Sequence, residues 1–458
     1  MDSKQVHIIG AGLAGSEAAL QLAARGVRVS LFEQRPAVRT AVHETGLCAE
    51  LVCSNSLKSV KPASAAGMLK AELETLGSPV FACARATSVP AGGALAVDRM
   101  RFSESVTRLV KEHPLIGRVG GEAVSVREDG RVVYRDAAGD ERVSPPADAV
   151  LIATGPLTGD SLAHWLEDKT GSRGLAFYDA AAPIVMADSL DESRIFRQSR
   201  YGGDAPGDYL NAPFTKEEYE SFIAELIAAD RVIGRDFETK DLFNACQPIE
   251  EIARKGVDAP RFGPLKPVGL VDPATGRRPW AALQLRAEDA AGQSCNLVGF
   301  QTNLTFGEQK RVFRMIPGLE HAEFARFGVM HRNTFVDAPH ILDAHLRLSS
   351  ARGVPVYLAG QLSGTEGYCE AMRSGLHAAI SIDFLLRGMR PPALPRETAF
   401  GALIAYATDP ATVDYQPMHV NFGIMPPLEP PIRNKQARYA AYAERGTQAL
   451  ERYARAVG

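Results

Sequence analysis

The feature that most constrains this chain is a glycine motif near its N-terminus. Val6–Ile9 form a short apolar run, followed by Gly10, Gly12 and Gly15 in G-x-G-x-x-G spacing. In this motif the first glycine permits a tight turn, the second lets backbone approach a pyrophosphate, and the third lets a helix pack close to the strand. Helix formers follow at 16–25, so a pyrophosphate would lie at a helix N-terminus, whose free N–H groups favour anions.

A second strand pattern, at 27–32, completes this unit and leads into Glu33. An acidic side chain about 20 residues after the glycines can bind ribose hydroxyls. A glycine motif alone is also found in turns of unrelated α/β domains. Here strand, glycines, helix, second strand and acid occur in order, which predicts a Rossmann-type dinucleotide site.

A second strand-loop-helix unit is expected at 354–382, where an apolar strand precedes Gly360, Gly364 and Gly367. In flavoproteins such a C-terminal unit lies against the flavin, where helix N-terminal amides stabilise its anionic reduced form. A simple packing unit is the alternative. The strand at 148–156 ends in Ala-Thr-Gly, as in flavoproteins where the chain returns to the cofactor domain. Together these features favour FAD over NAD as the resident cofactor.

The positions of these units predict an α/β protein with a discontinuous Rossmann-type FAD-binding domain, 1–160 and 300–458. A smaller α+β domain is expected as an insertion at 161–299, with a helix at 216–229 introduced by Thr215. No second G-x-G-x-x-G is present, so NADH or NADPH would bind without a fingerprinted domain. The sequence shows no metal-ligand spacing and no internal repeat.

Composition indicates an ordinary globular protein of the cytoplasm. The 458 residues are 45% hydrophobic and 23% charged, without an apolar run long enough to span a membrane. Six scattered cysteines favour free thiols in a reducing compartment. A net charge of −3 argues against a generally basic nucleic-acid binder, but allows local basic patches. The basic segment 432–458, with interleaved tyrosines, is either a solvated face or an RNA-facing surface.

Two cysteines are candidates for chemistry. Cys53 stands in C-x4-C spacing with Cys48, as in flavin disulfide reductases. The glycine-rich surroundings and C-terminal His-Pro motif of those enzymes are missing, so a reductase pair and a buried core thiol are alternatives for Cys53. Cys246 precedes an amphipathic helix led by Pro248, and thiols near helix N-termini have depressed pKa values. Cys246 is therefore a candidate thiolate, with a buried core thiol as the alternative.

Over nearly its whole length the sequence resembles the bacterial folate- and FAD-dependent tRNA (uracil-5-)-methyltransferases, smaller relatives of the glucose-inhibited division protein A flavoproteins. The resemblance is carried by stretches that include IGAGLAGSEAA (9–19), AELVCSNSLKS (49–59), RFGPLKPVGL (261–270), NLVGFQTNLTFGEQKRVFRMIPGLE (296–320) and AGQLSGTEGY (359–368). It implies transfer of a one-carbon unit from 5,10-methylenetetrahydrofolate, by way of FAD, to C5 of the T-loop uridine at position 54 of tRNA. NADH or NADPH would reduce the flavin, and the T-arm would be the macromolecular partner, with no membrane and no obligatory protein partner.

The resemblance also implies roles for residues. Uracil C5 is a poor nucleophile until a thiolate adds at C6, and a second group must later remove the C5 proton. Family positions match Cys246 as the C6 nucleophile and Cys53 as the acid/base near the flavin. Cofactor contacts are implied for Gly10, Gly12, Gly15, Glu33, Gly360, Gln361, Gly364, Glu366 and Gly367. Contacts with RNA or folate carboxylates are expected for Lys310 and Arg311.

The surroundings of Cys246 depart from the family pattern. Family members read Glu-Gly-Cys, then Leu or Met, before Pro-Ile-Glu, whereas this chain has Asn244, Ala245, Cys246 and Gln247 before Pro248. Ribosomal RNA is therefore an alternative substrate. A non-catalytic flavin-bearing RNA-binding protein is a weaker alternative.

Overall fold

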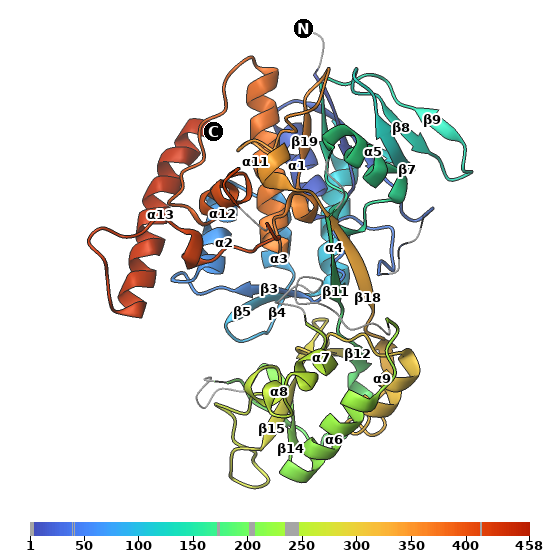
Figure 1. Ribbon diagram of the computed structural model, residues 1–458, viewed down its shortest axis with the longest axis vertical. Helices are drawn as coiled ribbons and strands as arrows, with labels where there is room; N and C mark the ends of the chain where they lie inside the picture. The colour runs from blue at the N-terminus through green and yellow to red at the C-terminus, as the bar shows by residue number, and fades with distance from the viewer. Residues whose placement is uncertain are drawn as a thin grey trace.

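The computed structural model describes residues 4–38, 40, 42–171, 175–200, 207–233, 247–412 and 415–458. Figure 1 shows two lobes, one above the other, with both ends of the chain in the upper lobe. The lower lobe is built from the middle of the chain. Among the described residues, no helix combines the length and the apolar character needed to cross a membrane.

A five-stranded sheet forms the centre of the upper lobe. Every pairing in it is parallel. Its strands, in spatial order, are β19 (Val356–Leu358), β10 (Ala149–Ile152), β1 (Gln5–Ile9), β2 (Arg28–Glu33) and β6 (Ile116–Gly120). β1, β10 and β19 are almost continuously buried, as expected for parallel strands that are covered on both faces, whereas the edge strand β6 is mostly half-buried or exposed. β1 and β19 both pair with β10, so the two predicted cofactor units meet in one sheet.

Helices and small sheets surround this centre. The helices of the upper lobe are α1 (Leu13–Ala24), α2 (Ala65–Thr75), α3 (Pro79–Ala86), α4 (Arg99–Glu112), α5 (Asp160–Thr170), α10 (Ala338–Ile341), α11 (Tyr368–Leu386), α12 (Ala399–Ala407) and α13 (Lys435–Val457). One antiparallel sheet joins β3 (Ser56–Ser59), β5 (Ala94–Val97) and β4 (Ser88–Val89), and another joins β7 (Glu122–Val126), β8 (Val132–Arg135) and β9 (Glu141–Val143). Short 3-10 turns are η1 (Gly155–Leu157), η5 (Gly360–Ser363) and η6 (Phe422–Ile424).

The lower lobe has a sheet and a core of its own. Its antiparallel sheet has the order β13 (Phe196–Arg197), β14 (Tyr209–Phe214), β15 (Ala281–Ala287), β16 (Ser294–Leu297), β12 (Ile184–Met186) and β17 (Phe324–Arg326). Its helices are η2 (Ala187–Ser189), α6 (Lys216–Ala228), α7 (Ile249–Arg254), α8 (Ala259–Phe262) and α9 (Phe306–Phe313). Thr215 caps α6 in a reciprocal capping box with Glu218, which explains why the helix begins there.

An antiparallel ribbon of β11 (Leu175–Ala180) and β18 (Met330–Phe335) connects the lobes (Figure 1). The second core extends from Ala182 to Ala322, whereas Leu162 and Leu166 of α5 belong to the first core. Residues 300–322 therefore pack with the lower lobe. For the inserted domain we propose limits of about 181 and 329, set by these packing contacts, in place of the predicted 161–299.

Candidate functional site

Two adjoining cavities lie at the carboxyl ends of the parallel strands, where α1 and α11 begin. The smaller has a volume of about 70 Å³ and is lined by residues that include Gly10, Phe32 and Glu33. The larger has a volume of about 360 Å³ and is lined by residues that include Cys53, Gly360, Gln361, Glu366 and Gly367. Both are lined by Gly12, His43, Ala153 and Thr154, so they form one elongated cleft. Clefts at this edge of a parallel sheet are where doubly wound folds bind their ligands.

The three glycines of the first unit occupy different surroundings. Gly10 has φ +102°, and a Cβ on it would lie 2.5 Å from the Ala153 carbonyl oxygen. A Cβ on Gly15 would lie 1.8 Å from the Gly10 carbonyl oxygen, so Gly15 packs the helix and does not line the cleft. A Cβ on Gly12 would meet nothing within 4 Å, which leaves the N-terminus of α1 open toward the cleft. A dinucleotide pyrophosphate fits such an opening.

Glu33 lies in the wall of the smaller cavity with its carboxylate already well satisfied. The carboxylate accepts hydrogen bonds from the backbone N of Ala11 at 2.9 Å and from Arg35 through the backbone N at 2.9 Å and Nε at 2.8 Å. Burial opposes ionisation, but the hydrogen bonds and charge of Arg35 hold the pKa of Glu33 below its usual value. A ribose bound here would share this carboxylate with Arg35.

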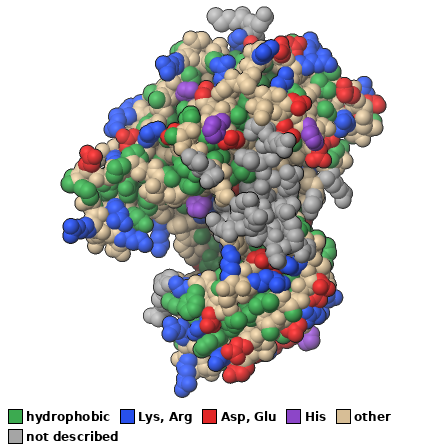
Figure 2. Space-filling model, viewed as in Figure 1, with side chains coloured by type: hydrophobic (Ala, Val, Ile, Leu, Met, Phe, Trp, Pro, Cys, Tyr) green, Lys and Arg blue, Asp and Glu red, His purple; other side chains and the backbone are tan. Residues whose placement is uncertain are grey.

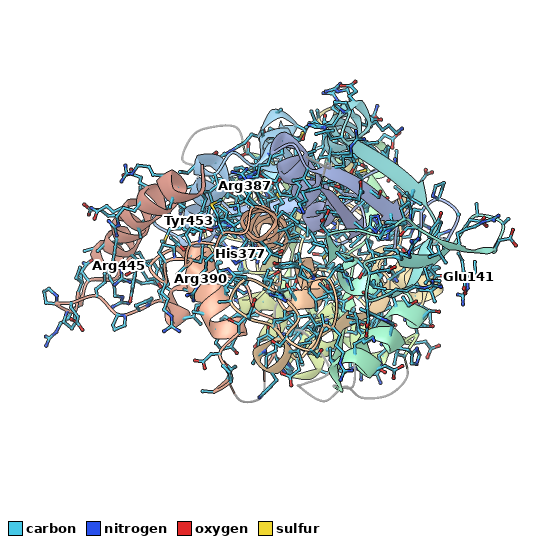
Figure 3. All side chains as sticks on the ribbon, turned by 90° about the horizontal axis from the view of Figure 1, so that it is seen from above. Glu141, His377, Arg387, Arg390, Arg445 and Tyr453 are labelled. Atoms are coloured by element: carbon cyan, nitrogen blue, oxygen red, sulfur yellow. The ribbon has the colours of Figure 1, made fainter. Side chains whose placement is uncertain are left out.

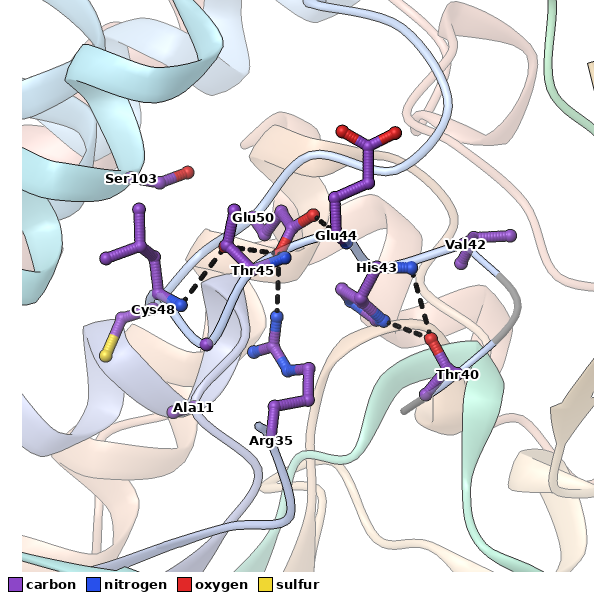
Figure 4. A network of polar contacts seen from close by, with 12 residues as sticks. Ala11, Arg35, Thr40, Val42, His43, Glu44, Thr45, Cys48, Glu50 and Ser103 are labelled. Atoms are coloured by element: carbon purple, nitrogen blue, oxygen red, sulfur yellow. Dashed lines mark hydrogen bonds and ion pairs between the residues drawn. The ribbon is translucent and has the colours of Figure 1, made fainter. Parts of the chain in front are cut away.

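The loop after β2 lines one side of the cleft through His43 and Glu50, and Figure 4 shows the polar contacts within this loop. Glu50 accepts hydrogen bonds from Thr45 Oγ1 at 2.7 Å and Arg35 Nη1 at 3.1 Å, which fixes the loop. His43 Nδ1 lies 2.7 Å from Thr40 Oγ1. Burial and the nearby charge of Arg35 lower the pKa of His43 to about 4, so a neutral imidazole lines the cleft. Sequence reasoning missed His43 and Glu50 because no motif marks either residue.

Two polar side chains of the second unit are unsatisfied at the cleft. Among the described residues, neither Gln361 Nε2 nor Glu366 Oε2 has a hydrogen-bond partner, although both atoms are buried. Burial and the neighbouring charge of Asp179 raise the pKa of Glu366 to about 8, so its carboxyl is protonated at neutral pH. Buried polar atoms need partners, and a flavin ring carries nitrogen and oxygen atoms along its edge. The second unit therefore fits a flavin.

Gly360, Gly364 and Gly367 all have positive φ, but only two of them line the cleft. Gly367 has φ +117° and caps the N-terminus of α11. Gly364 instead packs against Tyr415, whose hydroxyl oxygen would lie 1.8 Å from an added Cβ. The loop is thus shaped by backbone conformations that favour glycine.

Cys53 lines the larger cavity and is half-buried. Its backbone N donates to the hydroxyl of Tyr368 at 3.0 Å, and its carbonyl oxygen accepts from Arg99 Nη2 at 3.1 Å. The thiol lies 3.9 Å from the carbonyl oxygen of Ala180. Residues far apart in sequence thus hold this thiol in the wall of the cleft. Tyr368, which also lines the cavity, follows directly after the predicted glycines, so its position in the motif was a usable signal.

The lower lobe holds the Cys53 loop as well. Arg99 forms an ion pair with Glu288 of that lobe. Asn55 donates through Nδ2 to the carbonyl oxygen of Ala287 at 3.0 Å and accepts from Arg286 Nε at 2.8 Å. The C-terminal end of β15, which belongs to the lower lobe, thus holds the Cys53 loop of the upper lobe in place. No sequence signal predicted this connection.

Of the other two cysteines of the predictions, only Cys48 lies in the part of the chain that the structure describes. Cys48 is a fully buried free thiol that does not line the cleft, and burial raises its pKa. This position does not favour a reductase pair of Cys48 and Cys53. Cys246 lies outside the described residues. Three positions beyond it, Ile249 donates its backbone N to the carbonyl oxygen of Gln301 at 2.7 Å, and Gln301 lines the cavity.

Lys310 and Arg311 are not brought to the cleft. Both lie on α9 and are exposed or nearly so. Arg311 is engaged with Glu308 at 2.7 Å and Glu225 at 2.5 Å. Their predicted contact with RNA or folate stays a prediction, to which the ion pairs of Arg311 lend no support.

Comparison with known proteins decides the family. Residues 5–390 match the family model described as Glucose inhibited division protein A. Relatives from Moorella thermoacetica and Geobacter sulfurreducens, both named methylenetetrahydrofolate--tRNA-(uracil-5-)-methyltransferase TrmFO, are 49% and 50% identical. The alignments cover 97% and 98% of this chain, and the same shares of the two relatives. This chain belongs to the TrmFO family. The predicted resemblance is confirmed.

Solved structures show the same fold. The Aquifex aeolicus GidA structure in its form II crystal superposes with a TM-score of 0.70 at 17% identity, covering 99% of this chain and 74% of GidA. The form I crystal gives a TM-score of 0.68, also at 17% identity, covering 100% of this chain and 78% of that one. The predicted Rossmann-type α/β class is confirmed for this TrmFO-family chain.

Proposed function

We propose that this TrmFO-family protein is a methylenetetrahydrofolate- and FAD-dependent tRNA (uracil-5-)-methyltransferase. The observation that carries the proposal is near-full-length identity of 46–50% to eight relatives named for that activity. The cleft supports it, since the half-buried Cys53 thiol and the buried Cys369 thiol line a cavity of about 360 Å³ between the two predicted cofactor units. The activity needs a thiol and a flavin site.

The cleft suggests how FAD would be held. Gly10, Gly12 and Glu33 would contact its ADP half, and Gly360, Gln361, Glu366 and Gly367 its isoalloxazine half, while Gly15 and Gly364 shape the backbone behind these contacts. When bound, FAD supplies the redox chemistry of one-carbon transfer. NADH or NADPH would provide the electrons, binding without a domain of its own.

The two cysteines would divide the work on the uracil. A thiolate at Cys246 adds to C6, which makes C5 nucleophilic, and Cys53 removes the C5 proton once the one-carbon unit is attached. Cys53 suits this role because Tyr368 and Arg99 hold its backbone while the side chain lines the cavity.

The proposed substrate is the T-loop uridine at position 54 of tRNA. The base would leave its stack to enter the cleft, because an enzyme cannot reach C5 chemistry inside stacked RNA. Ribosomal RNA is the second candidate, since Asn244, Ala245 and Gln247 differ from the family pattern. Because reduced folate and tRNA are cytoplasmic, we place the reaction in the cytoplasm.

Nucleoside mass spectrometry tests the function. The flavin-loaded protein, methylenetetrahydrofolate and NADPH or NADH are incubated with unmodified tRNA and, separately, with ribosomal RNA. We expect 5-methyluridine in the T-loop, and a loss of about 10²–10⁴-fold in rate for Cys53→Ala, because that variant lacks an acid/base group. Cys48→Ala is the matched control and is expected to retain activity, because Cys48 does not line the cleft.

Each other result has a defined meaning. Methylation of ribosomal RNA alone would show that ribosomal RNA is the substrate and would leave the proposed chemistry intact. Nicotinamide oxidation without methylation of either RNA would overturn the transfer. Loss of bound flavin in Cys53→Ala would make that residue structural, and equal loss in Cys48→Ala would favour a cysteine pair.

A further inference from the structure

Two surface segments are strongly cationic although the chain as a whole has a net charge of −3. The segment 433–455, on α13, has six Arg and Lys residues against two Glu. The segment 254–280, around α8, has six Arg and Lys residues against two Asp. Positive charge is therefore concentrated at two places, as expected for a protein that binds a polyanion through local patches.

The cations at the start of α13 contact only neutral groups in the part of the chain that the structure describes: Arg438 donates to the carbonyl oxygens of Ile432 and Arg433, and Lys435 and Arg438 lie over the ring of Tyr439. The first turn of α13 contains no acidic residue, yet Arg433, Lys435 and Arg438 lie at or near this end. Cations at a helix N-terminus are disfavoured by about 0.3–1 kcal/mol each. Among the described residues, no carboxylate lies within ion-pair distance of these three. These three cations are therefore available to pair with an anion such as a phosphate group.

The opposite face of α13 fixes the helix to the body of the protein. Tyr453 and Val457 pack against Leu376 and Ile380 of α11. Figure 3 shows Tyr453 on the side of α13 that faces the body of the molecule. The exposed cations therefore project from a helix that is held in place.

A rigid aromatic platform stands beside α8. The Arg261 guanidinium lies 3.7 Å from the centre of the Trp280 ring, and its Nε donates to the Trp280 carbonyl oxygen at 2.8 Å. Leu265, just beyond, is fully buried and anchors the turn. Phe262 is nevertheless 75% exposed. A large apolar ring held in solvent next to a guanidinium suits stacking of a nucleic-acid base.

The two cationic segments lie on the same side of the molecule. Figure 1 shows α13 at the left edge of the upper lobe, and α8 toward the left of the lower lobe. Figure 2 shows the surface hollowed between them. The exposed Lys58, on β3, also lines the larger cavity, which links the cavity to the solvent-facing surface of the upper lobe.

We propose that tRNA docks across this hollow, with its phosphates on the start of α13 and on the cations around α8, and with an unpaired base stacked on Phe262. The proposal rests on the proposed function for the identity of the RNA. Proteins recognise RNA loops largely by stacking splayed bases on aromatic side chains, while phosphate contacts set position. The α13 end would position the tRNA, and the α8 platform would bind one of its unpaired bases.

The electrostatic half is tested by binding of an unmodified tRNA transcript over a range of salt concentrations. Replacing two cations, in the double variant Arg433→Gln/Lys435→Gln, should weaken binding about tenfold and lower the salt slope by about 1.5. The double variant Arg452→Gln/Arg455→Gln removes equal charge from the other end of α13 and should bind almost as the unaltered protein. Equal losses in both would overturn the docking site, because net charge alone would then explain binding.

The stacking half is tested with Phe262→Ala, which should weaken tRNA binding about tenfold, within the range known for one stacked base. Phe306→Ala is the matched control, since Phe306 is also exposed, at 53%, but lies on α9. Figure 1 shows α9 on the other side of the lower lobe. Unchanged binding by Phe262→Ala would overturn the platform.

Bound-flavin absorbance should match that of the unaltered protein in all four variants, and no thermal midpoint should fall by more than a few degrees, while that of Arg433→Gln/Lys435→Gln is expected to rise slightly because two cations leave the helix N-terminus. These readouts separate docking from folding. Binding is measured without turnover, so the two proposals fail separately. A protein that binds tRNA through these residues but never methylates it would keep the surface and overturn the function. If the protein methylates tRNA while all variants bind tRNA normally, the proposed docking surface is wrong, and the two cationic segments serve another class of partner.

Discussion

At the scale of single residues, the cleft is distinguished by buried polar atoms that have no hydrogen-bond partner among the described residues. Gln361 and Glu366 point buried polar atoms into it without partners among the described residues. Leaving such an atom unsatisfied costs about 1–3 kcal/mol. This cost is recovered only when a ligand supplies the missing hydrogen bonds. We therefore expect FAD, when bound, to supply hydrogen-bond partners to these atoms.

We expect Glu366 to make FAD binding dependent on pH. Its pKa of about 8 means that the carboxyl is neutral below that pH and anionic above it. A buried anion disfavours an electron-rich ring and phosphates nearby, so FAD affinity should fall as pH rises through about 8. Fluorescence titration of the apoprotein at several pH values measures this fall.

The matched variant is Glu366→Gln, which stays uncharged. Its FAD affinity should remain level through the same pH range. A parallel fall in both proteins would show that another group titrates.

Residue-level features differed in how far the sequence could reveal them. The positions of Gly10 and Gly12 were readable because a tight turn and an open backbone require glycine. The raised pKa of Glu366 was not, because it results from burial in the folded cleft and from the charge of Asp179, which a distant strand supplies. Similarly, the hydroxyl of Tyr368 reaches the backbone of Cys53 from a site 315 positions away. Contacts of this kind leave no local pattern.

At the scale of elements, the close crossing of α1 and α11 positions both halves of the cleft. A Cβ on Gly375 would lie 2.1 Å from the Ala14 carbonyl oxygen, so the helices touch through backbone. Gly375→Ala should destabilise the fold by about 1–3 kcal/mol, as overpacking does, and lower the flavin content. Denaturant unfolding and the flavin-to-protein absorbance ratio measure the two effects.

Gly307, in α9, provides the control for that substitution. A Cβ there would meet nothing within 4 Å. Gly307→Ala should therefore leave flavin content unchanged and stabilise slightly, because alanine favours helix. A Gly375→Ala protein as stable and as yellow as this control would contradict the proposed role of the crossing.

Element prediction succeeded where local signals were strong. The capping residue Thr215 located α6, and the glycine units located β1, α1, β19 and α11. The order of the lower sheet was not predictable, since β12 pairs with β16 and β17 from far along the chain. Alternation identifies a strand but does not identify its partner.

At the scale of the whole molecule, ligand binding should stabilise the fold. The cleft is lined by segments from residue 9 to residue 371, so an occupant contacts distant parts of the chain at once. FAD at about 100 times its Kd should raise the free energy of unfolding by about 2.7 kcal/mol. Thermal unfolding of the apoprotein with and without FAD measures this gain.

Riboflavin distinguishes the contributions of the two cavities to binding, because it lacks the ADP half of FAD. At equal concentration it should give a smaller gain than FAD. Equal gains would mean that the smaller cavity contributes nothing to binding.

The contacts of the Cys53 loop have a consequence for how such proteins can be recombined. Arg286, Ala287 and Glu288 belong to the lower lobe, yet they hold Asn55 and Arg99 of the upper lobe in place. A chimera that exchanges the lower lobe alone would cut these contacts and release the thiol from its setting. The two lobes should therefore be exchanged together. A lower lobe from another protein would keep these contacts only if residues 48–59 and Arg99 were taken from the same protein.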